Sequence, residues 1–428
     1  MSAKRLSGAT ALFLTAAVFA AWMIYRIFQF PGRHALVWEI PIDLNIYALA
    51  GAEVAQGGLL YDAPYIGDLP FTYPPFAGVV FTFLADLSKN WILTLWQVGT
   101  AVALALVYVL VFRERGYRLT PLAWLISIAL TIATTAFYPF QGTLHFGQIN
   151  VFLMLLVALD FLPRHRLPGI GIGLAAGLKL TPAYLGLVLL LQKRLGAALG
   201  SVLTFLATVA IGWWVVPDAK TFWTDAMFNS SRVGEHSNPG AQSLRSILER
   251  NFDISGGWPW LLMVIFIFAL TVLAVLVALR RGNATVAMSM AGISSCLVSP
   301  FSWFHHWMWV APLALAVILW SNEKLHALLS PRLGLAGRQL VGFLSFWPGV
   351  LVCLPFIARV VLPVELYESI KALPTHDLWF TGAGVLYLAA YGIIGTLVPH
   401  HATGQHAASP NGRRDPRHGL AARRKLRG

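Results

Sequence analysis

Long apolar runs separated by short polar segments dominate this chain of 428 residues. A helix needs about 20 mostly apolar residues to cross a membrane, and the run at 260–279 is one of many of that length. A membrane β-barrel would instead show alternating strands of about ten residues. The pattern predicts an all-α polytopic membrane protein with about eleven to thirteen transmembrane helices.

The composition supports this prediction. Hydrophobic residues make up 57% of the chain and charged residues only 11%, whereas soluble domains carry about 25% charged residues. Much of the surface is therefore expected to face lipid. Both cysteines, Cys296 and Cys353, lie inside apolar runs, so neither a disulfide nor a thiolate metal site is expected. We expect no metal and no cofactor.

Basic residues give the orientation, because cytoplasmic loops are rich in Lys and Arg. Lys4 and Arg5 precede the first apolar run, which has no clear cleavage site and is expected to stay as an uncleaved helix. Further basic clusters lie at 113–118, 163–166, 193–194, 280–281 and 324–338. The segments between them are the external candidates: 31–70, 138–148, 217–258, 299–306 and 362–377. The main external loops are expected at 31–70 and 217–258.

The net charge of +13 does not indicate a nucleic-acid partner, because the charge is concentrated at the C-terminus. Residues 401–428 hold seven Lys and Arg against one Asp. A basic tail after a last span fits the cytoplasmic side and anionic lipid headgroups. We expect a membrane domain at 1–400 and a disordered cytoplasmic tail at 401–428.

Two regions do not fit a simple alternation of spans. Residues 71–113 contain two apolar runs where one crossing is needed. The run at 167–192 must leave and return, so a broken helix or a re-entrant hairpin is expected there, with "GLKLTP" (177–182) near its tip. No internal repeat is apparent, which weakens a transporter interpretation.

The external segments carry most of the unusual polar residues, and Asp43 comes first. One interpretation is an N-cap for a short helix over the following residues. The other is a general base at the membrane surface, since a carboxylate near apolar surface has a raised pKa and still accepts a proton. Tyr47 lies four residues on and shares the helical face with Asp43.

Other polar residues stand near the ends of apolar runs. Tyr73, in "LPFTYPPF" (69–76), fits either an aromatic belt or the wall of a sugar or lipid site. Gln148 and Asn150 begin an apolar run and need hydrogen-bond partners, from other helices or from sugar hydroxyls. Lys179 lies at membrane depth, where it either reaches back to the interface or binds a lipid phosphate.

His305 and His306 stand among aromatic residues in "VSPFSWFHHWMW" (298–309). Adjacent side chains on a helix point about 100° apart, so the pair is a poor chelator for one metal. An interfacial role without chemistry and a role in hydrogen bonding or proton transfer both remain open. Arg232 and Arg245, in a polar external segment, are either phosphate ligands or solvated side chains.

An ordered set of short motifs resembles glycosyltransferase family 87, of the polytopic GT-C superfamily. The motifs span 43–309 and read "DLNIY", "GGLLYD", "FTYPPFA", "GQINVFL", "GLKLTP", "RVG", "QSL" and "SPFSWFHHWMW". The family includes actinobacterial polyprenol-phosphate-mannose-dependent mannosyltransferases. The resemblance implies that Asp43 is the catalytic base and that His305 and His306 lie in the active site. The candidate substrate-binding residues are Tyr47, Tyr73, Gln148, Asn150, Lys179, Arg232, Gln242 and Arg245.

The same resemblance implies an inverting enzyme at the outer face of the plasma membrane. The donor would be a polyprenyl-phosphate mannose, and the acceptor a mannosylated phosphatidylinositol-type glycolipid, joined through an α-1,2 linkage. The segment "NPGAQSL" (238–244) departs from the mannoside-enzyme motif, which bears on the acceptor more than on the donor. An arabinofuranosyltransferase that uses polyprenyl-phosphate arabinose is the alternative within the class, and a lipid or solute transporter is the alternative outside it.

Overall fold

The computed structural model describes residues 4–28, 39–163 and 166–397. The predicted tail at 401–428 and residues 31–38 of the first external segment lie outside these residues. The α-helices are α1 (Ala9–Phe28), α2 (Ile42–Ala55), α3 (Pro75–Phe81), α4 (Lys89–Glu114), α5 (Pro121–Ala133), α6 (Tyr138–Phe146), α7 (Asn150–Phe161), α8 (Ile170–Leu178), α9 (Gly186–Leu191), α10 (Leu195–Val215), α11 (Ala219–Thr224), α12 (Leu244–Phe252), α13 (Gly257–Arg280), α14 (Ala284–Val298), α15 (Val310–Val361), α16 (Val364–Lys371), α17 (Trp379–Ala389) and α18 (Gly395–Leu397). Short helical turns that matter below are η1 (Thr82–Leu84), η3 (Thr181–Leu185), η6 (Phe304–Trp309) and η7 (Pro374–Leu378).

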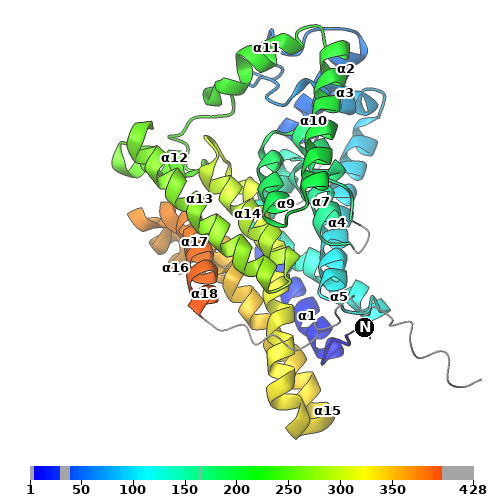
Figure 1. The fold of residues 1–428 in the computed structure, drawn as a ribbon, viewed down its shortest axis with the longest axis vertical. Helices are drawn as coiled ribbons and strands as arrows, with labels where there is room; N and C mark the ends of the chain where they lie inside the picture. Colours follow the sequence, from blue (N-terminus) through cyan, green and yellow to red (C-terminus); the bar gives the residue numbers. More distant parts are fainter. Residues whose placement is uncertain (1–3, 29–38, 164–165, 398–428) are drawn as a thin grey trace, which may run out of the picture.

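The predicted all-α membrane architecture is confirmed (Figure 1). Seven helices in the described part of the chain are long and apolar enough to cross a membrane. They are Ala9–Phe28, Lys89–Glu114, Leu195–Val215, Gly257–Arg280, Phe304–Leu329, Gly334–Val361 and Thr375–Leu397. An eighth is counted if the pair α5 and α6, bent by 84°, forms one broken span. The expected eleven to thirteen full spans is therefore too high.

The difference arises because several apolar runs fold into helices too short to span. These are Pro75–Leu84, Asn150–Phe161, Thr181–Leu191 and Ala284–Val298. The doubtful region at 71–113 thus holds one short apolar element and one full-length helix, α4. The predicted break at 167–192 is confirmed, because Lys179 has extended backbone angles of φ −154° and ψ 128° between α8 and η3.

The longest helical stretch, α15, is a hairpin. Gly334 has a φ of 58°, which L side chains adopt only with strain, and it separates two membrane-length halves. Gly349 packs against Ala314 and Ile318 of the other half, so the two halves run side by side. In Figure 1 the turn of this hairpin reaches the lower end of the molecule.

The two ends of the molecule differ in charge and in structure. At one end Lys4 binds Glu323 at 2.8 Å, and Arg115 lies 3.9 Å from the same carboxylate. Basic segments that sequence analysis assigned to one side of the membrane thus meet in space. Figure 1 shows α2, α3 and α11 at the upper end, away from the N-terminus at the lower end.

Candidate active site

A cavity of about 550 Å³ opens among α2, the 69–74 segment, the break at 179–184 and the segments 222–233 and 295–306. Ligand pockets in proteins typically measure about 300–1,000 Å³. Its walls come from segments more than 250 residues apart in the chain. Of the elements that line it, α2 and α11 lie at the upper end of the molecule (Figure 1).

Asp43 lies in the first turn of α2 and lines this cavity. The helix begins at Ile42 after Pro41, and no side chain caps it, so the N-cap interpretation of Asp43 is wrong. Gln148 donates a hydrogen bond from Nε2 to Asp43 Oδ2. Among the described residues, no donor reaches the other oxygen, Oδ1. One carboxylate oxygen therefore remains available to a ligand in the cavity.

The surroundings of Asp43 change its acidity. Burial raises the pKa of Asp43 from 3.8 to about 6, while the Gln148 hydrogen bond and the charge of Lys179 act in the opposite direction. A carboxyl group with a pKa of about 6 is ionised at neutral pH and is a stronger base than an exposed aspartate. These are the properties that a general base at pH 7 requires.

Two tyrosines continue the hydrogen-bond network. The hydroxyl oxygens of Tyr47 and Tyr73 are 2.7 Å apart, and the Tyr73 hydroxyl donates to Gln148 Oε1 at 3.1 Å. Tyr47 and Asp43 line the same cavity, which confirms their predicted shared face. Tyr73 is buried in the cavity wall, so the interpretation as a lipid-facing belt residue is wrong for this side chain.

Lys179 stands opposite, at the break between α8 and η3. Its Nζ lies 3.1 Å from Asn150 Oδ1, 3.4 Å from the Tyr73 hydroxyl and 3.0 Å from His306 Nε2. An ammonium group has three N–H bonds, so each has one acceptor within reach. Lys179 points into the cavity network, and the interpretation in which it reaches out to the interface is wrong.

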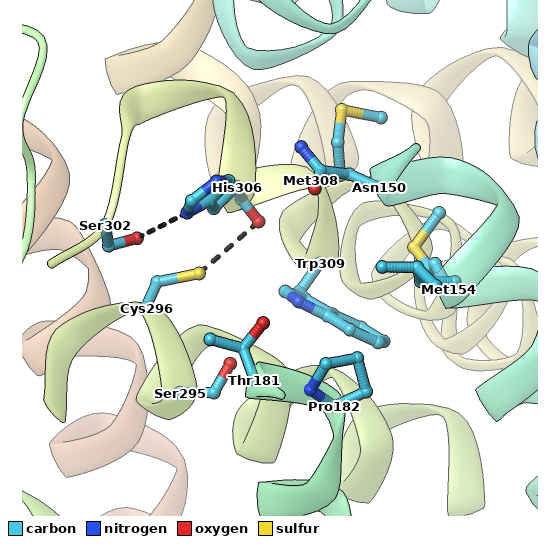
Figure 2. Close-up of a pocket in the computed structure, with 11 residues that line it drawn as sticks. Asn150, Met154, Thr181, Pro182, Ser295, Cys296, Ser302, His306, Met308 and Trp309 are labelled. Carbon is cyan, nitrogen blue, oxygen red and sulfur yellow. Dashed lines mark hydrogen bonds between the residues drawn. The ribbon is translucent and has the colours of Figure 1, made fainter. Parts of the chain in front are cut away.

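His306 completes the network on the far wall. Its Nδ1 lies 3.2 Å from Ser302 Oγ and also faces the Trp303 backbone amide. Figure 2 shows His306 beside Ser302 and Cys296, which are among the residues that line a small inner chamber of about 30 Å³. A chamber of that size holds a single water molecule when polar groups line it. His306 thus borders both the main cavity and this inner chamber.

His305 is placed differently from its neighbour. Its ring is buried among aromatic residues, it does not line the main cavity, and neither ring nitrogen has a hydrogen-bond partner in the described part of the chain. Its backbone carbonyl accepts from Asn150 Nδ2 at 3.0 Å. The two rings contact edge to face, with an interplanar angle of 81°. Within the described ranges, no group of three or more His, Cys, Asp or Glu side chains is arranged to hold a metal ion.

The remaining predicted residues separate into two groups. Arg232 lines the cavity. Gln242 and Arg245 do not: Gln242 donates to Asp377 Oδ1 at 3.2 Å, and Arg245 donates to the Ser255 carbonyl at 2.9 Å. Sequence reasoning missed several wall residues, namely Thr181, Tyr184, Asn229, Ser302 and Trp303. Ser302 and Trp303 belong to the "SPFSW" motif, which was the available signal.

A model of glycosyltransferase family 87 matches residues 71–300, which is more than half of the chain. The chain belongs to glycosyltransferase family 87. The predicted family and enzyme class are therefore confirmed, and the transporter alternative has no support. Asp43 and His306 lie outside the matched range, whereas Tyr73, Gln148 and Lys179 lie within it.

Curated relatives agree with the family. A polyprenol-phosphate-mannose-dependent alpha-(1-2)-phosphatidylinositol pentamannoside mannosyltransferase of Mycolicibacterium smegmatis is 33% identical over 82% of both chains. Its namesake from Mycobacterium tuberculosis is 36% identical over 65% of this chain and 66% of its own length. An alpha-(1->3)-arabinofuranosyltransferase of Corynebacterium glutamicum is 31% identical over 42% of this chain and 43% of its own. No solved structure matches.

This family 87 site brings several groups capable of proton transfer into one cavity. A carboxylate with a free oxygen, a lysine and a histidine share one cavity whose other walls are largely apolar. A chain of hydrogen bonds through Tyr73 and Gln148 connects Lys179 to Asp43. The site therefore combines a carboxylate that can accept a proton with a positive charge in the same cavity.

Proposed function

We propose that the protein is an inverting mannosyltransferase of family 87. It transfers mannose from polyprenyl-phosphate mannose to a mannosylated phosphatidylinositol-type glycolipid, forming an α-1,2 linkage at the outer face of the plasma membrane. The observation that carries the proposal is the free oxygen of Asp43 in the same cavity as the Lys179 ammonium. The printed names of the 33%- and 36%-identical relatives support the donor and the type of acceptor.

Asp43 acts as the single base. Its Oδ1 takes the proton from an acceptor hydroxyl. At the same time the hydroxyl oxygen of the acceptor forms a bond to the anomeric carbon of the donor mannose. The bond between that carbon and the donor phosphate oxygen breaks, and polyprenyl phosphate leaves with the electron pair. Among the described residues that line the cavity, no second carboxylate is present to act as a nucleophile. One base without a nucleophile is the arrangement of an inverting reaction.

The leaving phosphate needs compensating charge. Lys179 supplies an ammonium group, and Arg232 lines the same cavity with its guanidinium, which suits phosphate oxygens. His306 Nε2 lies 3.0 Å from Lys179 Nζ and helps to hold the ammonium group in place for the leaving phosphate. Charge aimed at a developing anion is typically the largest single contribution to catalysis.

The distribution of charge supports the proposed orientation. Lys4 and Arg115 meet Glu323 at the end of the molecule away from α2. Basic segments prefer the cytoplasm, so the cavity end with Asp43 faces outward. A lipid donor and a lipid acceptor then both approach from the outer leaflet.

The first experiment is product formation in nanodiscs that contain the full chain. Polyprenyl-phosphate mannose and a phosphatidylinositol mannoside acceptor are supplied, and the lipids are analysed by mass spectrometry. We expect a gain of one hexose that is absent with Asp43→Asn. Linkage analysis of the product then tests the α-1,2 bond, and protease accessibility of tags at either end tests the orientation.

One alternative has an observation in its favour, because the arabinofuranosyltransferase relative matches 192 residues at 31% identity. The same assay separates the two activities. A pentose gain with polyprenyl-phosphate arabinose, together with no hexose gain, keeps the base and the cavity but replaces the sugar.

A further inference from the structure

An ion pair outside the cavity joins two segments that are far apart in the sequence. Arg250 in α12 donates from Nε to Asp377 Oδ2 at 2.9 Å and from Nη2 to Oδ1 at 2.8 Å. Asp377 lies in η7, immediately before α17. This two-fold contact holds both groups in one plane, a geometry that Lys cannot reproduce. It is also partly buried, with 11% of the arginine and 24% of the aspartate side chain exposed.

The same arginine fixes a loop. Its Nη1 donates to the backbone carbonyls of His236 at 2.6 Å and Asn238 at 2.8 Å. On the other side, Asp377 also accepts from Asn251 Nδ2 at 2.9 Å and from Gln242 Nε2 at 3.2 Å. The pair therefore ties the 236–242 loop to α12 and to the segment that begins the last apolar helix.

The loop in turn holds the wall of the cavity. The Gln242 backbone amide donates to the Ser302 carbonyl at 2.6 Å, and the Phe304 amide donates to the Gly240 carbonyl at 2.8 Å. These two bonds form an antiparallel bridge between Ala241 and Trp303. The position of residues 302–304 therefore depends on the position of the loop.

Residues 302 and 303 lie next to the polar groups of the main cavity. Trp303 lines the cavity, and its indole N–H donates to the Val233 carbonyl at 3.3 Å, next to Arg232. Ser302 Oγ lies 3.2 Å from His306 Nδ1. A path of hydrogen bonds thus runs from Asp377 through Arg250 and the loop to His306, whereas Asp43 lies on a different wall supported by Gln148.

We propose that Arg250 and Asp377 are positioning residues that set the Trp303–His306 wall of the substrate cavity. Neither side chain lines the cavity, and Asp377 lies beyond the family match at 71–300. The C-terminal third of the chain thereby contributes to substrate binding through one carboxylate. Only the kinetic readout of this proposal rests on the proposed transferase function.

The test is Asp377→Asn in the full-length protein in nanodiscs, with Arg250→Lys as the second variant. Both variants lose the two-fold contact and let the loop and the Trp303 wall shift. We expect a higher KM for a lipid substrate and a ten- to hundredfold lower kcat/KM, since a misplacement of about 1 Å costs up to a hundredfold. A mere loss of folded protein lowers the apparent kcat and leaves KM unchanged, so the KM shift marks a positioning role.

Hydrogen exchange gives a second readout that needs no activity. Peptides covering Gln242 and Phe304 should exchange faster in both variants, while peptides covering α4 stay unchanged. Glu365→Gln in α16 is the matched control, because this exposed acidic residue lies in the same C-terminal segment. It should change neither KM nor exchange.

Unchanged exchange at Gln242 and Phe304 in both variants would overturn the proposal, and so would faster exchange with an unchanged KM. If the wild type transfers no sugar from either donor, the proposed function fails instead. The exchange experiment then still decides whether the ion pair holds the wall.

Discussion

A buried aspartate, Asp160, and a partly buried one, Asp43, show how one side-chain type serves two purposes in this fold. Asp160, at the end of α7, accepts hydrogen bonds from the backbone amides of Gly169 at 2.8 Å and Ile172 at 2.7 Å, one on each carboxylate oxygen. Asp43 accepts from Gln148 on one oxygen, and its other oxygen faces a cavity of about 550 Å³. Both carboxylate oxygens of Asp160 accept hydrogen bonds from amides at the start of α8, whereas only one oxygen of Asp43 has a donor among the described residues.

The difference teaches that an acidic residue in an apolar protein is not by itself a sign of catalysis. A carboxylate whose acceptor sites are filled by backbone amides stabilises a turn, because those amides would otherwise lack partners. A carboxylate that keeps one oxygen free, beside a cavity and a lysine, is available for proton transfer. The number of unoccupied acceptor sites separates the two roles better than burial does.

The largest expected effect comes from removing the carboxylate of Asp43, the residue with the free oxygen. Asp43→Asn should lower kcat by about 10²–10⁴-fold, the usual contribution of a general base. The melting temperature should be unchanged or higher at pH 7.5. Because the folded-state pKa of Asp43 is raised to about 6, its stabilising contribution exists only at low pH and is lost as the pH rises through 6. Turnover in nanodiscs and a thermal shift assay measure both quantities.

Asp160→Asn is the matched control. It should lower the melting temperature, because an NH₂ group replaces one of the two oxygens that accept from backbone amides. The turnover of the remaining folded protein should stay near that of the wild type. If Asp160→Asn abolishes turnover of well-folded protein, the distinction between the two aspartates is wrong.

Next in size is the loss of positive charge opposite Asp43. Lys179→Met should lower kcat/KM for the lipid-phosphate donor by about 10²-fold, since groups that stabilise a developing anion contribute 10²–10³. The acid limb of the pH–rate profile should also move to higher pH, because the lysine charge lowers the pKa of Asp43. Equal turnover by Lys179→Met and wild type across the pH range would remove Lys179 from the phosphate site.

A smaller effect separates the two histidines. His306→Ala should lower kcat roughly tenfold, since His306 lines the cavity and contacts Lys179. His305→Phe should retain most activity, because the buried ring has aromatic neighbours and no hydrogen-bond partner among the described residues. The reverse order of effects would show that His305 carries the catalytic role that sequence analysis assigned to both.

The smallest expected effect is a shift in pH dependence. The hydrogen bond from Gln148 lowers the pKa of the Asp43 carboxyl. Because Gln148→Leu removes this bond, the pKa of Asp43 should rise above about 6. Activity needs the ionised carboxylate, so the acid limb should move to higher pH while the rate on the plateau falls little. A profile measured from pH 5 to pH 8 detects the shift, and an unmoved limb would mean that another group titrates there.

The residues themselves determined the class of the protein. Long apolar runs and few charges specify an all-α membrane fold, because an apolar run of about 20 residues satisfies its backbone only as a helix in lipid. Short motifs indicated the family, and the break at Lys179 followed from a run that had to leave and return. Asp43, Tyr73, Gln148, Lys179 and His306 were all expected near one site, and they line one cavity or its wall.

Tertiary structure alone decided the rest. Sequence spacing cannot state which apolar runs reach full length, and four of them form helices too short to span a membrane. It could not separate His305 from His306, since one residue along a tight turn changes a side chain from the buried to the cavity side. The link from Asp377 to the cavity wall was also invisible, because residues 127 positions apart meet only through folding. Local patterns specify helices and lipid exposure, whereas long-range hydrogen bonds decide which polar groups remain free for chemistry.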